Sequence, residues 1–243
     1  MRHKLNLDLT ELNGFSMLLH GGYAVGKTHF VGDMLREESQ YGPVRFLNVK
    51  GEDGYRSLAS LGLGENGESV DSLDDFSDAL KEWRGLKLQA VAIDSFKPLV
   101  RLVMYDIFKE DRLPRVGGKE NEWGPVHFKV EGIANSLRSV AKYVLCTCPS
   151  DKSVNQLDGR TYITPDLPGR EAAGSAGWFD MVAYLKADSV SATKVIRELI
   201  IRPDNSVITR QRLPRAIVKD IIVPENGGGW HNLKVEIQKA LNK

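Results

Sequence analysis

The feature that most constrains the fold of this chain is a glycine-rich stretch, GGYAVGKTH at 21–29. An apolar run at 15–19 precedes it and predicts a buried strand, and the apolar spacing of 27–38 predicts a helix directly after it. The stretch contains Gly-x-x-x-x-Gly-Lys-Thr, which is the P-loop pattern, in the strand-then-helix context that this pattern requires. The sequence therefore predicts a phosphate-binding turn between the two elements.

Each residue type in this stretch has a physical reason. Glycines let the backbone curl so that its N–H groups converge on phosphate oxygens, and the N-terminus of the following helix adds partial positive charge. We expect Lys27 to reach the β- and γ-phosphates of a nucleoside triphosphate, and the Thr28 hydroxyl to hold Mg²⁺. The residues expected to contact the nucleotide are Gly21, Gly22, Tyr23, Ala24, Val25, Gly26, Lys27, Thr28 and His29.

The second part of such a site is an aspartate at the end of a buried strand. The stretch AVAID supplies four apolar residues and then Asp94, where the strand reaches the ligand-binding edge of an α/β sheet. We expect the Asp94 carboxylate to hold the magnesium shell. The alternative is a solvated aspartate in a turn.

Short apolar runs alternate with segments of helical periodicity as far as residue 148. Strands joined by helices of this length imply right-handed βαβ crossovers and a mostly parallel sheet flanked by helices. The clearest helix is expected at 123–142, where apolar residues recur at steps of four and three. Further strands are predicted at 43–49, 88–94 and 143–148, and further helices at 73–83 and 98–108.

After residue 149 the sequence changes character. Turn-forming residues are frequent at 161–177, and the three segments that follow predict strands with short connections, which we interpret as an antiparallel extension of the same sheet. These strands are expected at 178–185, 194–201 and 206–213. The predicted organisation is an N-terminal segment at 1–14, one α/β core at 15–223, and a flexible joint with a short C-terminal helix at 224–243, the helix itself at 233–241.

Composition narrows the possible partners and location. The 243 residues carry a formal charge of +1, so a nucleic-acid partner would have to be held by a local basic surface. The two cysteines, Cys146 and Cys148, are expected to be reduced thiols, as in cytosolic proteins. No stretch approaches the roughly 20 apolar residues of a membrane span, and the first residues lack the apolar core of a signal peptide. We expect a cytoplasmic protein with no membrane partner.

The order of these parts resembles the RecA-like P-loop ATPase core, and within it the small phage recombinases related to RecA that act as single-strand annealing proteins (the Sak group). The likeness spans most of 15–215, and only the ensemble is specific, because the P-loop is common to many proteins. It is carried by GGYAVGKTHF, FLNVKGEDGYRSLASLGL, AVAIDSF, the long helix running into YVLCTCPSDK, and GSAGWFDMVAYL followed by TRQRLP.

The resemblance implies an ATPase that uses ATP and Mg²⁺, assembles into a ring or filament of identical subunits, and promotes annealing or pairing of single-stranded DNA in phage recombination. Its implied partners are single-stranded DNA, further copies of the chain and, as an additional candidate, a single-strand DNA-binding protein. The implied setting is the cytoplasm of a bacterial host.

The resemblance also implies catalytic residues beside Lys27. In RecA-like proteins a glutamate on the βα unit after the P-loop helix activates the attacking water, and Glu52 is the candidate here, with Asp53 as the fallback. A charged turn without a catalytic role is the alternative. Two basic residues late in the RecA-like core complete the site of the neighbouring subunit, and Arg210 and Arg212 are the candidates. A solvated strand face is the alternative for this pair.

The chain departs from the RecA-like pattern just beyond the fourth core strand, where a polar sensor side chain is usual. The stretch CTCPSDK offers Thr147 or Ser150 there, and Pro149 stands where a polar side chain is expected. Slow or DNA-independent hydrolysis would be consistent with this departure.

Two long segments, 109–123 and 150–170, correspond to the DNA-facing loops of RecA-like recombinases. Both exceed usual loop lengths, which indicates function or disorder. Acidic residues are interleaved with the basic ones, so composition alone does not predict DNA binding. The residues that the resemblance places against phosphates are Arg112, Arg115, Lys119, Lys152, Arg160 and Arg170.

Two other functions stay open at this point. A P-loop kinase for a nucleotide or small molecule would transfer the γ-phosphate to an acceptor, with DRLPRVGGK as an arginine-containing lid. A non-hydrolysing, ATP-gated DNA-binding switch would use the same P-loop without turnover.

Overall fold

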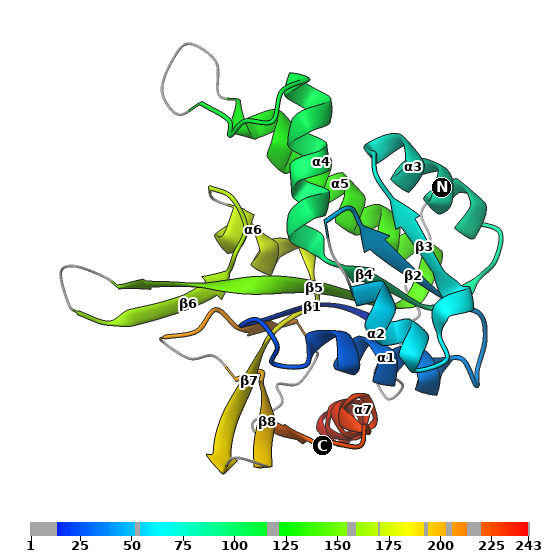
Figure 1. Cartoon of the computed structure of the whole chain (residues 1–243), viewed down its shortest axis with the longest axis vertical. Coiled ribbons are helices and arrows are strands. Elements are labelled where there is room, and N and C mark those ends of the chain that lie inside the picture. Colours follow the sequence, from blue (N-terminus) through cyan, green and yellow to red (C-terminus); the bar gives the residue numbers. More distant parts are fainter. Residues whose placement is uncertain are drawn as a thin grey trace.

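The chain forms one sheet with helices on both faces (Figure 1). The strand order is β10-β8-β7-β1-β5-β4-β2-β3, with β6 paired to β5 and β9 paired to β7. The computed structural model describes residues 14–51, 54–115, 122–154, 159–169, 171–191, 194–202, 206–212 and 220–242.

The elements follow the predicted alternation in the first part of the chain. The strands are β1 (Phe15–Gly21), β2 (Val44–Val49), β3 (Gly67–Val70), β4 (Leu88–Asp94), β5 (Ala141–Val154), β6 (Thr161–Pro165), β7 (Met181–Ser191), β8 (Lys194–Ile200), β9 (Arg210–Gln211) and β10 (Ile221–Val223). The helices are α1 (Lys27–Glu38), α2 (Gly54–Ser60), α3 (Leu73–Trp83), α4 (Phe96–Phe108), α5 (Trp123–Val140), α6 (Glu171–Trp178) and α7 (Gly229–Leu241), with a 3-10 turn at Gly64–Asn66.

The centre of the sheet is parallel. From β7 through β1, β5, β4 and β2 to β3, each strand runs parallel to its neighbour. Strands β8, β9 and β10 join antiparallel at the β7 side. The predicted fold class, a mostly parallel RecA-like α/β sheet with an antiparallel C-terminal extension, is confirmed.

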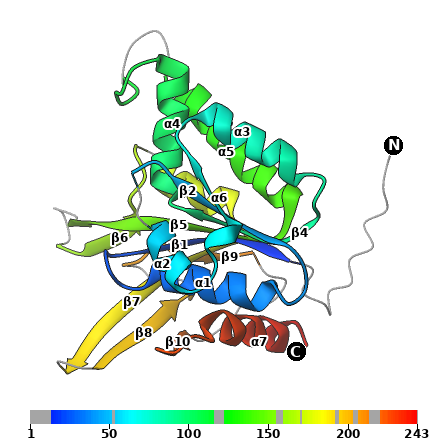
Figure 2. The ribbon, with the colours of Figure 1, turned by 45° about the vertical axis from the view of Figure 1, so that its right-hand side comes forward.

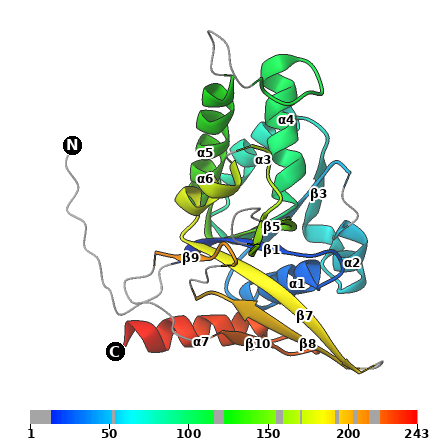
Figure 3. The same cartoon turned by 90° about the vertical axis from the view of Figure 1, so that its left-hand side faces the viewer.

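Helices cover the sheet in two layers. On one face α3, α4, α5 and α6 pack together, and on the other face α1 packs with α2 and α7 (Figures 2 and 3). Trp83 and Phe96 are fully buried in the first layer, and Phe30 and Trp230 in the second. The sheet is therefore buried on both faces, as expected for parallel strands joined by helical crossovers.

Sequence and structure agree residue for residue at α1, α3 and β4. Helix α3 begins where expected because Ser72 caps it: its hydroxyl accepts from the Asp75 N–H at 3.1 Å, and the Asp75 carboxylate accepts from the Ser72 N–H at 2.9 Å. In α5 every apolar position of the predicted stripe is buried, but the helix ends at Val140 rather than 142 because β5 begins there.

The segment 150–170 is not the long loop that its sequence suggests. Strand β5 continues to Val154 and pairs antiparallel with β6, so that a hairpin extends from the sheet. Beyond Ser150 the β5 arm of this hairpin is exposed. An exposed strand needs no apolar alternation, and the sequence pattern therefore missed it.

Other elements after residue 149 also differ from expectation. Residues 171–178, expected as turn and strand, form α6, whose small side chains resemble a turn-rich segment. Of the strand expected at 206–213, the structure describes only β9. The short elements α2, β3 and β10 were not predicted, since none is long enough to show a hydrophobic period.

The C-terminal segment packs against α1. Residues 224–230 were expected to form a flexible joint, but Gly229 already begins α7 and Trp230 is fully buried. The contacts that hold this segment are described below. Among the described residues, no helix has the length and apolar character needed to cross a membrane.

Candidate functional site

The P-loop joins the carboxyl end of β1 to the first turn of α1, as predicted. Gly26 caps α1 with φ of 101°, a left-handed conformation that favours glycine. A Cβ at this position would lie 2.9 Å from Nε of Arg197, so a side chain here would also collide with a neighbouring strand. The curl of the backbone therefore depends on glycine at position 26 for two reasons.

The Lys27 ammonium lies inside this curl. Its Nζ donates to the carbonyls of Gly21 and Gly22 at 2.9 and 2.7 Å. The cation is thus held where the backbone N–H groups of a P-loop converge on phosphates.

Asp94 lies beside the P-loop at the end of β4. Its carboxylate is buried and accepts hydrogen bonds from the hydroxyls of Thr28, at 3.0 Å, and Thr147. A Cβ on Gly54 would lie 1.9 Å from Oδ2 of Asp94, so only glycine fits there. The structure brings together the two side chains that the sequence proposed as magnesium ligands.

The candidate sensor residues have separate partners. Thr147 bonds Asp94, whereas the Ser150 hydroxyl lies 2.9 Å from Nδ1 of His20. Nε2 of His20 lies 2.8 Å from the Ile208 carbonyl, which can only accept, so Nε2 donates and Nδ1 accepts from Ser150. Burial lowers the pKa of His20 to about 4, and the nearby Lys27 charge acts in the same direction. His20 is therefore a neutral, satisfied core residue.

The candidate general base, Glu52, and its fallback, Asp53, lie outside the described residues. Gly51 ends the described chain before them, and Gly54 resumes it against the Asp94 carboxylate. Their roles stay predictions.

The strand register places the arginine pair away from the phosphates of its own chain. Gly21, which opens the P-loop, pairs with Leu185, whereas Arg210 pairs with Val182, about 10 Å back along β7 at the usual rise per residue. Both Arg210 and Arg212 are exposed. A role of this pair at a neighbouring subunit stays a prediction.

Arg197 is a residue at the site that the sequence reasoning missed. It lies on β8, and its Nε donates to the Val25 carbonyl of the P-loop at 3.0 Å. The two residues are 172 positions apart, and only the pairing of β8 with β7 and β7 with β1 brings them together. The only signal in the sequence was the excess of basic residues in this region.

Among the predicted DNA contacts, Arg112 has intramolecular partners. Its guanidinium donates to Glu122 at 2.7 and 3.2 Å and to Glu110 at 3.0 Å. The hydrogen bonds from Arg112 lower the pKa of Glu122 to about 2. Arg112 therefore holds the ends of this segment together. Of the other candidates, Arg115, Lys152 and Arg160 are exposed, and Lys119 and Arg170 lie outside the described residues.

A groove of about 610 Å³ opens beside the P-loop at the carboxyl edge of the sheet. Two exposed tyrosines line it, Tyr23 from the P-loop and Tyr105 from α4. Its cationic side chains are Lys50, Lys97 and Arg101, of which Lys97 is paired with Asp166. This is the edge where open α/β sheets bind ligands.

A second cavity, of about 310 Å³, lies on the other side of the P-loop beside α1. Its floor includes the buried ring of Phe30, and Arg197 lines it next to Gly26. The lining residues are Gly26, His29, Phe30, Asp33, Arg36, Leu61, Arg197, Val223, Pro224, Glu225, Asn226 and Gly227.

The residues present fit a nucleoside triphosphate with Mg²⁺. A glycine-dependent curl with an enclosed lysine matches the phosphate tail, and a hydroxyl and a carboxylate in contact are hard oxygen ligands that Mg²⁺ accepts together with phosphate oxygens. Elsewhere in the described chain, no three His, Cys, Asp or Glu side chains gather as a metal site.

Comparison with known proteins gives a family and a fold. Residues 13–213 match the family described as AAA domain (AAA_24). Among solved structures, the chain is similar in fold to an isolated ATPase domain, with 14% identity over 90% of this chain and 84% of that chain and a TM-score of 0.50. The flagellar accessory protein FlaH from Methanocaldococcus jannaschii is 10% identical over 87% of this chain and 85% of its own, with a TM-score of 0.48. No curated protein matches the chain.

Proposed function

Since it belongs to the AAA domain family, which its residues 13–213 match, we propose that this protein binds and hydrolyses ATP with Mg²⁺ and uses the nucleotide to promote annealing or pairing of single-stranded DNA. The family and the RecA-like fold support the nucleotide part. The DNA part rests on the resemblance to phage annealing recombinases, and the cytoplasm of a phage-infected bacterium is the setting that it implies.

The observation that carries the nucleotide part is the contact of Thr28 with Asp94 beside the enclosed Lys27 ammonium. In this proposal the P-loop N–H groups and Lys27 bind the phosphate tail, while Thr28 and Asp94 hold Mg²⁺. Bound Mg²⁺ supplies neutralisation of the charge on the β- and γ-phosphates. Thr147 fixes the orientation of Asp94 through its hydroxyl.

We propose Glu52 as the general base for the attacking water. Support comes from its place in the sequence, two residues before Gly54, whose backbone packs on Asp94. A base near the magnesium aspartate is within reach of a water in line with the γ-phosphate.

Hydrolysis kinetics test this assignment. Glu52→Gln should lower kcat at least about 100-fold while the affinity for ATP stays the same, because general bases typically contribute factors of this size. Asp53→Asn is the matched control and should keep its activity. An unchanged rate in Glu52→Gln removes Glu52 as the base, and a wild-type protein that binds ATP without turnover favours the ATP-gated switch.

For the DNA part, the cations available at the surface include Arg115, Lys152 and Arg160, all exposed. We propose that these residues contact phosphates, together with Lys119 and Arg170, and that Arg112 positions its segment through its glutamate partners. The test is fluorescence anisotropy with a labelled oligonucleotide over a salt series. Affinity that stays weaker than high micromolar at low salt would remove the recombinase proposal.

Assembly is the remaining part of this proposal. Arg210 and Arg212 are exposed and lie off their own P-loop, so we propose that they complete the site of a neighbouring copy in a ring or filament. Arg210→Ala should then reduce hydrolysis only under conditions in which the protein is assembled. Equal loss in a dilute monomer would contradict action across an interface.

The groove beside Tyr23 favours one second candidate, a nucleotide or small-molecule kinase. Its volume lies within the range of ligand pockets, and Lys50 and Arg101 could hold a phosphorylated acceptor on the γ-phosphate side of the P-loop. Product analysis with γ-labelled ATP separates the two functions. Label in inorganic phosphate supports the ATPase, and label in an added nucleoside monophosphate supports the kinase.

A further inference from the structure

We propose that the cavity between α1 and the turn at 223–227 holds the base and ribose of the nucleotide, so that the C-terminal segment forms a wall of the nucleotide site. This inference rests on the proposed binding of a nucleoside triphosphate at the P-loop. It concerns residues outside 13–213, the part of the chain that matches the AAA domain family. The wall is therefore a feature of this chain's own C-terminal segment.

The position of the cavity follows from the geometry of the P-loop. Gly26 and His29, at the start of α1, line one side of it. The phosphate tail of a nucleotide lies over the helix N-terminus, so the nucleoside must leave that point along one side of α1. The groove beside Tyr23 is on the Asp94 side, where the γ-phosphate and Mg²⁺ are expected, and the cavity beside His29 is left for the base and ribose.

The chemistry of the lining suits a nucleoside. Phe30, Val223 and Pro224 provide apolar surface, and Asn226 and Glu225 provide an amide and a carboxylate at the exposed rim. Pockets for small ligands combine an apolar lining with a few polar groups in this way, and 310 Å³ is at the lower end of their size range. A planar aromatic base with polar edges and a ribose with hydroxyl groups match these two kinds of surface.

Arg197 links the cavity to the P-loop. Its Nε is bonded to the Val25 carbonyl, and its guanidinium lines the cavity. A guanidinium plane can stack on an aromatic base. Val223 of β10 pairs with Arg197 in the sheet, so the C-terminal strand holds the segment that carries this arginine.

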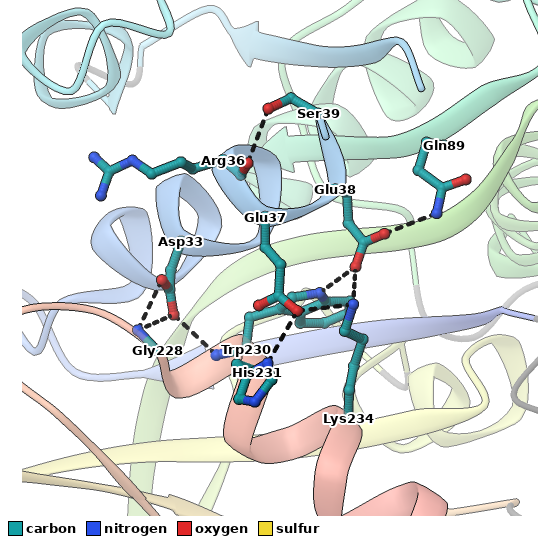
Figure 4. A network of polar contacts seen from close by, with 10 residues as sticks. All are labelled: Asp33, Arg36, Glu37, Glu38, Ser39, Gln89, Gly228, Trp230, His231 and Lys234. Atoms are coloured by element: carbon teal, nitrogen blue, oxygen red, sulfur yellow. Dashed lines mark hydrogen bonds and ion pairs between the residues drawn. The ribbon is translucent and has the colours of Figure 1, made fainter. Parts of the chain in front are cut away.

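Two carboxylates of α1 fix the wall in place, as Figure 4 shows. Asp33 accepts from the N–H of Gly228 at 2.8 Å and from the N–H of Trp230 at 2.9 Å. These are N–H groups at the start of α7, which lack partners within the helix, and the carboxylate also faces the positive end of the helix dipole. Asp33 therefore caps α7 from another helix and sets the position of the turn before it.

Glu38 provides the second attachment. It is fully buried and accepts from Trp230 Nε1 at 2.7 Å, Lys234 at 2.6 Å and Gln89 at 2.8 Å. The Trp230 ring stacks on Phe15 with centroids 5.3 Å apart. The turn at 223–227 is thus held between β10 and a firmly packed helix, and its residues face the cavity from a fixed frame.

The test compares ATP with inorganic tripolyphosphate, which carries the phosphate tail without a nucleoside. Asn226→Trp should fill the cavity mouth and weaken ATP binding about tenfold or more, while tripolyphosphate affinity stays within about twofold of the wild type. Asn135→Trp, an exposed asparagine on α5 across the sheet, is the matched control and should bind both ligands normally. Lys27→Ala should lose both ligands.

A second measurement reads the contact directly. Photolysis of 8-azido-ATP on the wild-type protein should label the tryptic peptide 220–234. Equal ATP affinity in Asn226→Trp and the wild type, or label confined to peptides outside 220–234, would overturn the cavity assignment while leaving the P-loop proposal intact. Failure of the wild type to bind either ATP or tripolyphosphate would instead overturn the proposed function, and this inference with it.

Discussion

The two walls of the proposed nucleotide site are built in different ways. The phosphate wall is local: nine consecutive residues at 21–29 form it, and its shape follows from backbone conformation. The nucleoside wall is distant, since Asp33 reaches Gly228 across 195 positions and Glu38 reaches Trp230 across 192. A local motif is set by its own residue types, whereas a distant wall depends on a few buried polar contacts.

This difference predicts different responses to mutation and pH. Changes in the phosphate wall should alter ligand binding and leave the fold intact. Changes at the carboxylates that hold the nucleoside wall should lower the stability of the protein, because they leave buried polar partners unsatisfied. The predictions below separate the two walls, beginning with the largest effect.

Replacing Lys27 with Ala should weaken MgATP binding by at least about 100-fold, because the variant loses the cation inside the P-loop curl. The free energy of unfolding should change by less than about 0.5 kcal/mol, as for most partly exposed sites without a structural role. Calorimetric titration and urea denaturation measure the two effects. Lys81→Ala, at an exposed lysine of α3, is the control. A large loss of stability in Lys27→Ala would contradict the separation of the walls.

Replacing Glu38 with Ala should lower the free energy of unfolding by about 3 kcal/mol, the typical cost of leaving a buried ionic partner unpaired. Burial by itself would raise the pKa of Glu38, but hydrogen bonds from Lys234, Trp230 and Gln89 outweigh burial and lower it. The stabilisation is therefore present above the ordinary carboxyl pKa and is lost as the pH falls through the lowered value. Glu37→Ala is the control, and its loss should stay below about 1 kcal/mol because that carboxylate is more exposed. Equal losses in the two variants, measured in urea, would count against a special role of Glu38.

Stability should also fall as the pH is lowered from about 6.5 to about 4, because of His20. Its pKa is about 4 in the folded protein, while an unfolded histidine titrates near 6.5, so the unfolded state binds more protons between these values. The full contribution approaches about 3 kcal/mol at the acid end. His20→Asn cannot titrate and should show a shallower loss over this range. Identical pH profiles for the two proteins would contradict a buried neutral His20.

The smallest effect is expected far from both walls. Ser72→Ala removes the cap of α3 and should cost about 1 kcal/mol of stability. MgATP affinity should be unchanged, since α3 lies on the opposite face of the sheet from α1. A change in affinity would show that the two layers are coupled more tightly than the contacts indicate.

The same contrast explains what could be predicted from the sequence. Elements with a strong local signal, such as α1, α3 and β4, have the predicted bounds, and the contact of Thr28 with Asp94 follows from the P-loop and the strand-end aspartate. Asp33 and Glu38 lie on the predicted helix α1, but nothing in its periodicity indicates that their partners come from the C-terminus.

Other misses have the same physical origin. Arg197 reaches Val25 only through two strand pairings, which a single sequence does not reveal. The hairpin of β5 with β6 is exposed along its outer part and therefore has no apolar alternation. Exposed strands and contacts between distant residues carry little local signal, and these are the features that the sequence reasoning did not find.

The most direct test of the account is a calorimetric titration of the wild-type protein with ATP, in the presence of Mg²⁺ and again with the metal chelated. We predict one binding site per chain, with affinity that falls markedly when Mg²⁺ is removed, because Thr28 and Asp94 then lose the ion that joins them to the phosphates. Absence of heat from both ATP and GTP with Mg²⁺ at ligand concentrations of about 1 mM would contradict the account.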